Sequence, residues 1–400
     1  MSNYNYKCFK CRKSFSPEKI EKEMLYLCPN CGKAERNKPL EGVLTVEYDY
    51  DELKKTLSRD DFLKLTPGKF WFYTELWPLN FMNFTEDQLN KLALPADQLF
   101  NFNIGGRELW IQDETRNPTL SYKDRATSLV ALKAIKLGIN KISAASTGNA
   151  GSSLAGICAR LGLQSIIYVP KNIPEEKRIQ IEAYGAQLKI VDGDYDKAFD
   201  VCLEDSEKNN WYNRNTAYNP LTIEGKKSAA YDIFISSKGK VPDAILIPVG
   251  DGVILSGISK GFSELVLLGW IDKLPKLIAV QSTGSDALVR FLETGKFEYK
   301  TANTIADSIS AGAPRNLYMV ADAVKESNGF AISVTDDEIL SAQKEFIKLT
   351  GVLCEPSCAG VYAAYKNLLT KNELKDDDSV LLLITGNGLK DVSSLKRMER

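Results

Sequence analysis

The 400-residue sequence contains no histidine. Without an imidazole, Ser-His-Asp triads, histidine-bound catalytic zinc and imidazole acid–base chemistry are all excluded. Proton transfer would then fall to lysine, tyrosine, a carboxylate, water or a cofactor phosphate. This restriction favours an enzyme whose base is a lysine amine.

Long hydrophobic runs and an excess of one charge are also lacking. No apolar stretch approaches the roughly 20 residues of a membrane-spanning helix, and the first residues show no hydrophobic signal region, so we expect a cytoplasmic protein without a membrane partner. The net charge is −1, and no basic run accompanies the aromatic stretch 70–78. Nucleic acid is therefore not an expected partner, and the stretch is interpreted as an arm docked on the main body.

Four of the eight cysteines form a regular set near the N-terminus. Cys8 and Cys11 are followed, after sixteen residues, by Cys28 and Cys31. Two Cys-x2-Cys pairs at this spacing are typical of a four-thiolate zinc ribbon, with disulfides or free thiols as the alternatives. We predict a structural zinc ion in a ribbon of residues 1–40. The other cysteines fall in expected helices and are interpreted as buried apolar residues: Cys158, Cys202, Cys354 and Cys358.

Strand and helix patterns alternate from Leu109 onward. Strands are expected at 108–112, 142–145, 165–169, 188–191, 244–249, 277–281 and 379–384, with a further strand at 44–51 leading into the arm. This alternation predicts an α/β fold with parallel sheets covered by helices on both faces. Ligands of such folds bind at the carboxyl ends of the strands.

Three segments at those strand ends carry candidate site residues. Lys123 is expected in the first turn of a helix, whose partial positive charge lowers the pKa of the amine and suits it to Schiff-base chemistry. The loop 146–151 opens another helix and could bind a carboxylate or a ring oxygen anion. The turn 250–254 has glycines that let backbone N–H groups approach a phosphate. Taken singly, a solvated lysine and ordinary turns would be the more common explanations.

Together with Thr385–Asp391, these segments resemble the threonine synthase branch of the fold-type II pyridoxal-phosphate (PLP) enzymes, in order and spacing over nearly the whole chain. The resemblance implies that Lys123 is the Schiff-base lysine and that Asn149 contacts the ring oxygen of the cofactor. Thr385 would face the pyridine nitrogen. The substrate carboxylate loop would comprise Ser146, Thr147 and Gly148, and the phosphate loop Gly250, Asp251, Gly252, Val253 and Ile254.

The resemblance also implies an architecture. We expect a tryptophan synthase β-like fold of two parallel-sheet α/β domains plus the ribbon. The large PLP-binding domain would comprise residues 41–127 and 216–400, and the smaller domain residues 128–215. A homodimer is expected.

The chain departs from this family where the substrate phosphate should bind. Threonine synthases hold the phosphate of phosphohomoserine with a threonine after the cofactor asparagine and with the arginine of an Asn-Ser-Val-Asn-Pro-x-Arg stretch. Ala150 and Thr222 occupy those two positions here. Since each charge-assisted bond contributes roughly 1.5–3 kcal/mol, their loss should weaken a phosphorylated substrate strongly. Arg315, Arg214 or Lys226 could compensate from elsewhere.

The leading hypothesis is a threonine-synthase-like lyase that catalyses elimination or β/γ-replacement on an amino acid with a leaving group. Lys123 would abstract the α-proton while residues 146–149 hold the carboxylate. Three alternatives stay open: a genuine threonine synthase with a relocated phosphate site, a serine/threonine dehydratase-type ammonia-lyase, and a catalytically silent binding module. Intact Lys123 speaks against the last.

Overall fold

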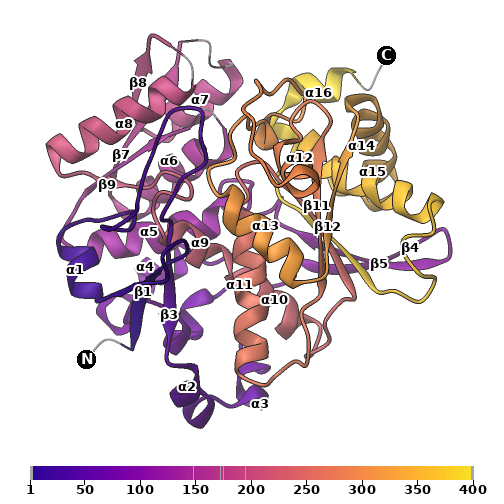
Figure 1. Cartoon of the computed structure of the whole chain (residues 1–400), viewed down its shortest axis with the longest axis horizontal. Helices are drawn as coiled ribbons and strands as arrows, with labels where there is room; N and C mark the ends of the chain where they lie inside the picture. Colours follow the sequence, from indigo (N-terminus) through magenta and orange to yellow (C-terminus); the bar gives the residue numbers. More distant parts are fainter. Residues whose placement is uncertain (1–2, 147, 172, 174, 194, 398–400) are drawn as a thin grey trace.

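The computed structural model describes residues 3–146, 148–171, 173, 175–193 and 195–397 (Figure 1). Within this part of the chain the strands form three sheets of three, six and four strands. Among the described helices, none is both long and apolar enough to cross a membrane.

The N-terminal sheet is antiparallel, with strand order β2-β1-β3. It consists of β1 (Tyr4–Cys8), β2 (Ser14–Phe15) and β3 (Leu44–Tyr48), with helix α1 (Pro17–Lys22) after β2. The strand expected at 44–51 ends early, at Tyr48. Asp49 caps helix α2 (Tyr50–Thr56) by accepting the Glu52 backbone N–H at 3.0 Å, so the chain turns there.

The arm that follows contains only short helices: α3 (Arg59–Phe62), α4 (Glu86–Asn90) and the 3-10 turns η1 (Phe70–Phe72), η2 (Thr74–Leu76) and η3 (Phe81–Asn83). Its aromatic stretch is largely buried. Tyr73 packs edge-on against Tyr231 with ring centroids 5.3 Å apart, and its hydroxyl donates to Asp232. Docking of this stretch on the main body is thereby confirmed.

The six-stranded sheet has the order β12-β11-β10-β13-β5-β4. Its strands are β4 (Leu99–Ile104), β5 (Arg107–Asp113), β10 (Ala244–Pro248), β11 (Lys276–Ser282), β12 (Phe330–Val334) and β13 (Val380–Ile384). All neighbours pair in parallel except β4, which forms an antiparallel hairpin with β5. The expectation of parallel sheets is therefore correct for this sheet except at one edge.

Two hydrophobic cores cover opposite faces of this sheet. Ile245 and Ile247 of β10 pack in one core with α11 (Val253–Leu267), whereas Leu246 packs in the other with α15 (Pro356–Thr370). Helix α14 (Asp336–Thr350) lies against α15 (Figure 1). The remaining helices of this region are α9 (Leu221–Lys226), α10 (Ser228–Ser236), α12 (Ala287–Thr294), η4 (Asp307–Ile309), α13 (Leu317–Glu326), η5 (Gly388–Lys390) and α16 (Val392–Arg397).

The four-stranded sheet is parallel, with the order β8-β7-β6-β9. It consists of β6 (Lys141–Ala145), β7 (Gln164–Pro170), β8 (Gln187–Val191) and β9 (Tyr212–Asn213). The associated helices are α5 (Lys123–Lys136), α6 (Asn149–Leu161), α7 (Glu175–Ala183) and α8 (Tyr195–Asn209). Alternate residues of β7 pack toward α6 and toward α8, so both faces are covered, as the alternating pattern predicts.

The four cysteines outside the ribbon are all buried, which confirms their interpretation as core residues. Three lie in helices, but Cys354 does not. Cys354 lies before the following helix, which begins at Pro356, and it forms an isolated antiparallel β-bridge with Asn387. The predicted domain boundaries stay a prediction.

Candidate functional site

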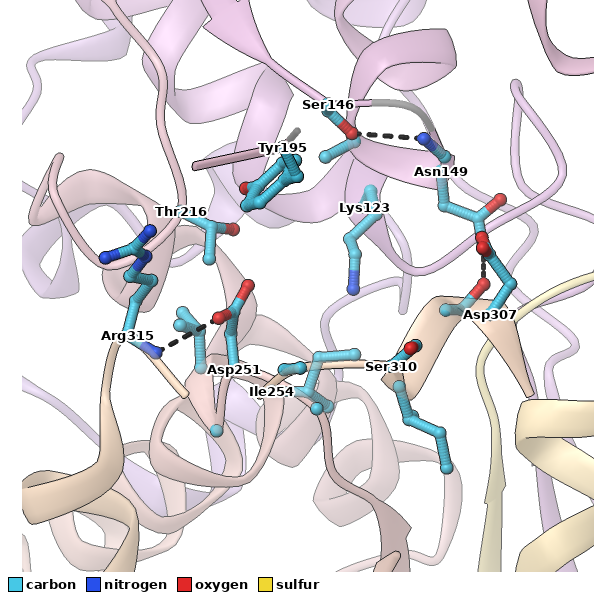
Figure 2. Close-up of a pocket in the computed structure, with 18 of the residues that line it drawn as sticks. Lys123, Ser146, Asn149, Tyr195, Thr216, Asp251, Ile254, Asp307, Ser310 and Arg315 are labelled. Carbon is cyan, nitrogen blue, oxygen red and sulfur yellow. Dashed lines mark hydrogen bonds between the residues drawn. The ribbon is translucent and has the colours of Figure 1, made fainter. Parts of the chain in front are cut away.

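A cavity of about 550 Å³ lies where the carboxyl ends of the two large sheets meet (Figure 2). Its lining includes residues that end or follow four parallel strands: Ala145 of β6, Pro170 of β7, Pro248 of β10 and Thr385 after β13. This is the edge at which ligands bind in α/β folds.

Lys123, the first residue of α5, extends into this cavity (Figure 2). The next residue, Asp124, turns away from it. Its buried carboxylate accepts the Thr119 backbone N–H at 2.7 Å and the Ser153 hydroxyl at 2.7 Å. The start of α5 is thus tied to α6 and to the preceding loop, which fixes the direction of Lys123.

Arg125 anchors the same helical turn on the other side. Its guanidinium donates to Glu114 at 2.7 and 2.9 Å and to Asp232 at 2.6 Å, with all three side chains at most 3% exposed. These two carboxylates raise the pKa of Arg125 although burial opposes its charge. A buried cation with complete partners is costly to disturb, so Arg125 serves as a rigid support for Lys123.

Burial lowers the pKa of Lys123, and the positive charge of Arg214 lowers it further. Glu355 and Asp251 oppose this effect without reversing it. A depressed pKa increases the fraction of free amine near neutral pH, and the free amine is the form that acts as a nucleophile or base.

Asn149 begins α6 beside this lysine and faces a carboxylate. Its Nδ2 donates to both Glu355 oxygens at 3.1 Å and to the Ser308 hydroxyl at 3.1 Å. Glu355 is 3% exposed and precedes Pro356 at the start of α15. No local sequence signal marks Glu355, because its neighbour Asn149 lies 206 positions away.

The predicted carboxylate loop lines the cavity at Ser146, Gly148 and Ala150. The Ser146 hydroxyl accepts the Gly148 backbone N–H at 3.3 Å. Thr147 lies outside the described residues.

All five residues of the predicted phosphate loop, 250–254, line the cavity. Gly252 has φ +84°, and a Cβ there would lie 2.7 Å from Val320 Cγ1. A Cβ at Gly250 would lie 2.9 Å from Ile309 Cα. The turn opens the 15-residue helix α11, whose first N–H groups have no partner within the helix. This backbone therefore fits a phosphate.

Thr385 lies at the end of β13, with its hydroxyl 3.2 Å from Cys358 Sγ. The backbone N–H groups of Thr385 and Gly386 also donate to this sulfur, each at 3.1 Å. Thr385 thus presents a neutral hydroxyl group at the wall of the cavity.

Three cations considered from the sequence for a substrate phosphate all line the cavity, but their surroundings differ. Arg315 forms an ion pair with Asp196, so its charge is already matched. Arg214 is 1% exposed, and its Nη2 has no partner among the described residues. Burial lowers the pKa of Lys226 well below its usual value, and the neighbouring cations Lys123 and Arg214 lower it further.

Thr222 is not among the lining residues of the cavity. It is fully buried in α9, where its hydroxyl donates to the Asn219 carbonyl at 2.7 Å and accepts the Ala217 backbone N–H at 3.2 Å. Ala217 has φ +59°, so this bond holds a backbone conformation that few non-glycine residues adopt.

The four ribbon cysteines also converge. The Sγ atoms of Cys8, Cys11, Cys28 and Cys31 all lie within 4.8 Å of one another, with Cys8 and Cys31 3.4 Å apart and Cys11 and Cys28 3.6 Å apart. Tetrahedral zinc with Zn–S bonds of about 2.3 Å requires sulfurs about 3.8 Å apart. All eight cysteines are free thiols. The donor set fits a structural zinc ion.

Comparisons with known proteins agree with this geometry. A family model described as pyridoxal-phosphate dependent enzyme matches residues 94–386. The chain is 34% identical to a threonine synthase of Methanocaldococcus jannaschii over 96% of its own length and 92% of the relative's. A threonine synthase of Methanosarcina acetivorans is 32% identical, with 97% and 92% covered.

Solved structures show the same fold. Maize serine racemase matches with a TM-score of 0.64 at 20% identity, covering 74% of this chain and 87% of the racemase. A fungal L-serine ammonia-lyase from Rhizomucor miehei matches with a TM-score of 0.64 at 20% identity, covering 75% and 96%. The chain belongs to the fold-type II pyridoxal-phosphate-dependent enzymes, in the group that includes the threonine synthases.

Proposed function

We propose that this protein catalyses elimination or β/γ-replacement on an amino acid that carries a leaving group, with Lys123 as the proton-transferring base. The observation that carries the proposal is the placement of the Lys123 amine in a cavity bounded by the glycine turn 250–254 and Asn149. Since the chain has no histidine, a lysine of lowered pKa is a suitable base in that cavity.

PLP would be held at both of its ends by residues that fit it. Gly252, Val253 and Ile254 line the cavity at the start of α11, where backbone N–H groups would suit the phosphate, while Asn149 and Thr385 would lie beside the ring. When bound, PLP supplies an electron sink for the charge that develops at the substrate α-carbon. Because Thr385 is a neutral partner, it would leave the ring nitrogen largely unprotonated, which favours elimination over transamination.

The protein's own residues would bind the substrate carboxylate, transfer the proton and hold the Lys123 amine in position. The start of α6, with Ser146, Gly148 and Asn149, would bind the substrate carboxylate through its backbone N–H groups. Lys123 would take the α-proton and return a proton after the leaving group has departed. Buried Asp124 and Arg125 would keep the amine within reach by fixing the first turn of α5.

A second candidate is threonine synthase itself, with the leaving phosphate bound at a relocated site. The supporting observation is the pair Arg214 and Lys226, two buried basic side chains that line the cavity and make no ion pair among the described residues. Arg214 Nη2 has no hydrogen-bond partner there. Burying a charge is costly, and a bound dianion would offset that cost by favouring the charged form of both side chains. Arg315 is a weaker candidate because Asp196 already neutralises it.

Replacing Lys123 by alanine tests the main proposal. K123A should lose all turnover and the visible absorbance of the bound cofactor, while its circular dichroism stays that of the unaltered protein. Lys136, in the last turn of the same helix, provides the control K136A, which should keep both. Turnover by K123A with any substrate would remove Lys123 from the mechanism.

A panel of substrates distinguishes the two candidates. Phosphohomoserine, phosphoserine, O-acetylserine, serine and threonine are each added to the PLP-loaded protein, and the products are identified. Release of phosphate together with threonine would identify a threonine synthase. Release of ammonia and a keto acid from serine or threonine would identify a dehydratase. A protein that binds PLP but converts none of them would support the binding-module alternative.

We also propose a structural zinc ion on Cys8, Cys11, Cys28 and Cys31, and a homodimer. The donor set supports the metal. Elemental analysis of protein purified without chelator should find about one zinc per chain, and C28S should lower that content. Light scattering of the purified protein measures the oligomeric state directly.

A further inference from the structure

Arg315 occupies a junction at the wall of the cavity (Figure 2). Its side chain forms an ion pair with Asp196 at the start of α8, and its guanidinium lies 4.6 Å from the centre of the Phe199 ring on the same helix. Its backbone N–H donates to Asp251 of the glycine turn at 3.0 Å. One residue thus joins a helix on the four-stranded sheet to the predicted phosphate loop.

Arg315 also binds the tip of a hairpin, residues 28–42, in the N-terminal ribbon. Arg315 Nη1 donates to the carbonyls of Lys38 at 3.2 Å and Glu35 at 3.5 Å, and the Arg315 carbonyl accepts the Leu40 backbone N–H at 3.0 Å. Arg315 is 3% exposed, so these bonds are shielded from water.

The base of that hairpin is formed by the cysteine cluster. Cys28 donates its backbone N–H to Gly42 at 2.8 Å, and Lys33 and Glu41 exchange backbone bonds at 3.0 and 3.1 Å. Cys28 and Cys31 lie at the start of the hairpin. An ion bound by their thiolates would therefore fix the base, while Arg315 fixes the tip.

The ribbon also packs on the strand end that precedes α9. The Asn213 backbone N–H donates to the Tyr26 hydroxyl at 2.7 Å, and the Tyr26 ring stacks on that of Tyr218 with centroids 5.1 Å apart. Leu40 and Val43 share a small buried core with Val253 of the glycine turn. The ribbon is therefore in contact with two of the segments that build the cavity.

We propose that Arg315 is a positioning residue that couples metal binding in the ribbon to cofactor binding in the cavity. A metal-loaded hairpin holds Arg315, and Arg315 holds both Asp251 and α8 in the arrangement that receives PLP. The inference rests on the proposed zinc and PLP sites, and it assigns Arg315 to neither of them. This role differs from the substrate-binding role that the sequence suggests for Arg315, which stays a prediction.

Coupling of this kind is reciprocal: if zinc raises the affinity for PLP by some factor, PLP must raise the affinity for zinc by the same factor. The full-length protein provides both measurements. Zinc affinity is determined by competition with a chromogenic chelator, with and without saturating PLP, and PLP affinity is determined by absorbance, with and without zinc. We expect each ligand to strengthen the other by about fivefold or more.

Arg315→Lys keeps the positive charge but loses the fork that reaches Asp196 and two carbonyls together. R315K should still bind zinc and PLP, but the factor by which each ligand raises the affinity for the other should fall toward one. Asp196→Asn removes the charge that pairs with Arg315 and should lower the factor in part. The matched control is Arg290→Lys: Arg290 also donates to an aspartate, at 2.8 Å, and to a carbonyl, at 3.1 Å, but it does not line the cavity. R290K should retain full coupling.

The inference is overturned if zinc and PLP bind independently in the unaltered protein, if R315K retains the full coupling factor, or if the cysteine cluster binds no metal. Should R315K fail to fold, C28S gives the second measurement: it should weaken PLP by the coupling factor without touching the cavity. Failure of the proposed function is separately recognisable, since either the unaltered protein would convert none of the substrates or K123A would keep turnover. If PLP itself does not bind, the zinc titration is repeated with inorganic phosphate as the cavity ligand.

Discussion

Lys226 and Lys227 are adjacent lysines whose removal should have opposite consequences. Both are buried, with 1% and 0% exposed. Lys226 lines the cavity without an ion-pair partner among the described residues. Lys227 lies on the other side of the chain, where it pairs with Glu224 and, at 3.0 Å, with Glu264. Substituting each lysine in turn therefore distinguishes a ligand-binding role, expected for Lys226, from a structural role, expected for Lys227.

Changing Lys226 to methionine should weaken a phosphate-bearing ligand and leave the fold intact. A charge-assisted hydrogen bond contributes roughly 1.5–3 kcal/mol, and each 1.4 kcal/mol is about tenfold in affinity. K226M should therefore bind phosphate about 10- to 100-fold more weakly. Its free energy of unfolding should not fall, because methionine replaces a buried amine that has no ion-pair partner among the described residues and keeps most of the volume.

Changing Lys227 to methionine should do the reverse. Glu224 and Glu264 would keep only Lys260 as a counter-charge, at 3.5 and 2.7 Å. Removing one partner from a buried ionic cluster costs about 3–5 kcal/mol. K227M should lose that much stability in urea unfolding, with its phosphate affinity unchanged while folded.

The assay is a calorimetric titration of inorganic phosphate into the PLP-loaded protein, so that the cofactor's own phosphate site is already filled. Urea unfolding of each variant is followed in parallel by circular dichroism. Phosphate affinity that is equal in K226M and the unaltered protein would refute the assignment of Lys226 to an anion site. Loss of stability in K226M comparable to that in K227M would refute the claim that Lys226 has no stabilising ion pair.

The other predictions concern pH and support of the site. Arg214 lowers the pKa of Lys123, so R214M should move the pH dependence of the rate of PLP incorporation to higher pH. Burial opposes ionisation of Glu264, yet its lysine partners lower its pKa to about 2, below the usual value of 4.5. Its stabilising contribution is therefore present above pH 4.5 and lost as the pH falls toward 2, and E264Q should flatten that part of the unfolding free energy against pH. Finally, R125M should cost about 3–5 kcal/mol in urea unfolding, because it leaves Glu114 buried without its cation.

Local pattern makes part of this fold and site predictable. Strand, turn and helix follow one another around Lys123 and around 250–254, and each signal lies within one continuous segment of sequence. Their place in the ligand site follows from the rule that ligands of parallel sheets bind at the carboxyl ends of the strands. The structure accordingly brings Lys123 and the glycine turn into one cavity.

What could not be predicted depends on distant partners. The sequence makes Arg315 a candidate phosphate ligand, which stays a prediction, and its ion-pair partner Asp196 lies 119 positions away. Glu355 contacts Asn149 from 206 positions away. Whether a buried charge is matched is decided by such contacts and not by its neighbours in sequence. The end of β3 at Tyr48 escapes prediction for a local reason, since the cap at Asp49 interrupts an alternating pattern that continues to residue 51.

The contacts between the ribbon hairpin and Arg315 also set an order of events during synthesis. The hairpin tip at Lys38 leaves the ribosome roughly 275 residues before Arg315, its partner. At about 5–20 residues per second, that interval lasts on the order of 15–55 seconds. A nascent ribbon must persist through this time without its docking surface, and a small antiparallel sheet of this kind has little core of its own. Metal captured early would keep the hairpin folded until the rest of the chain arrives to receive it.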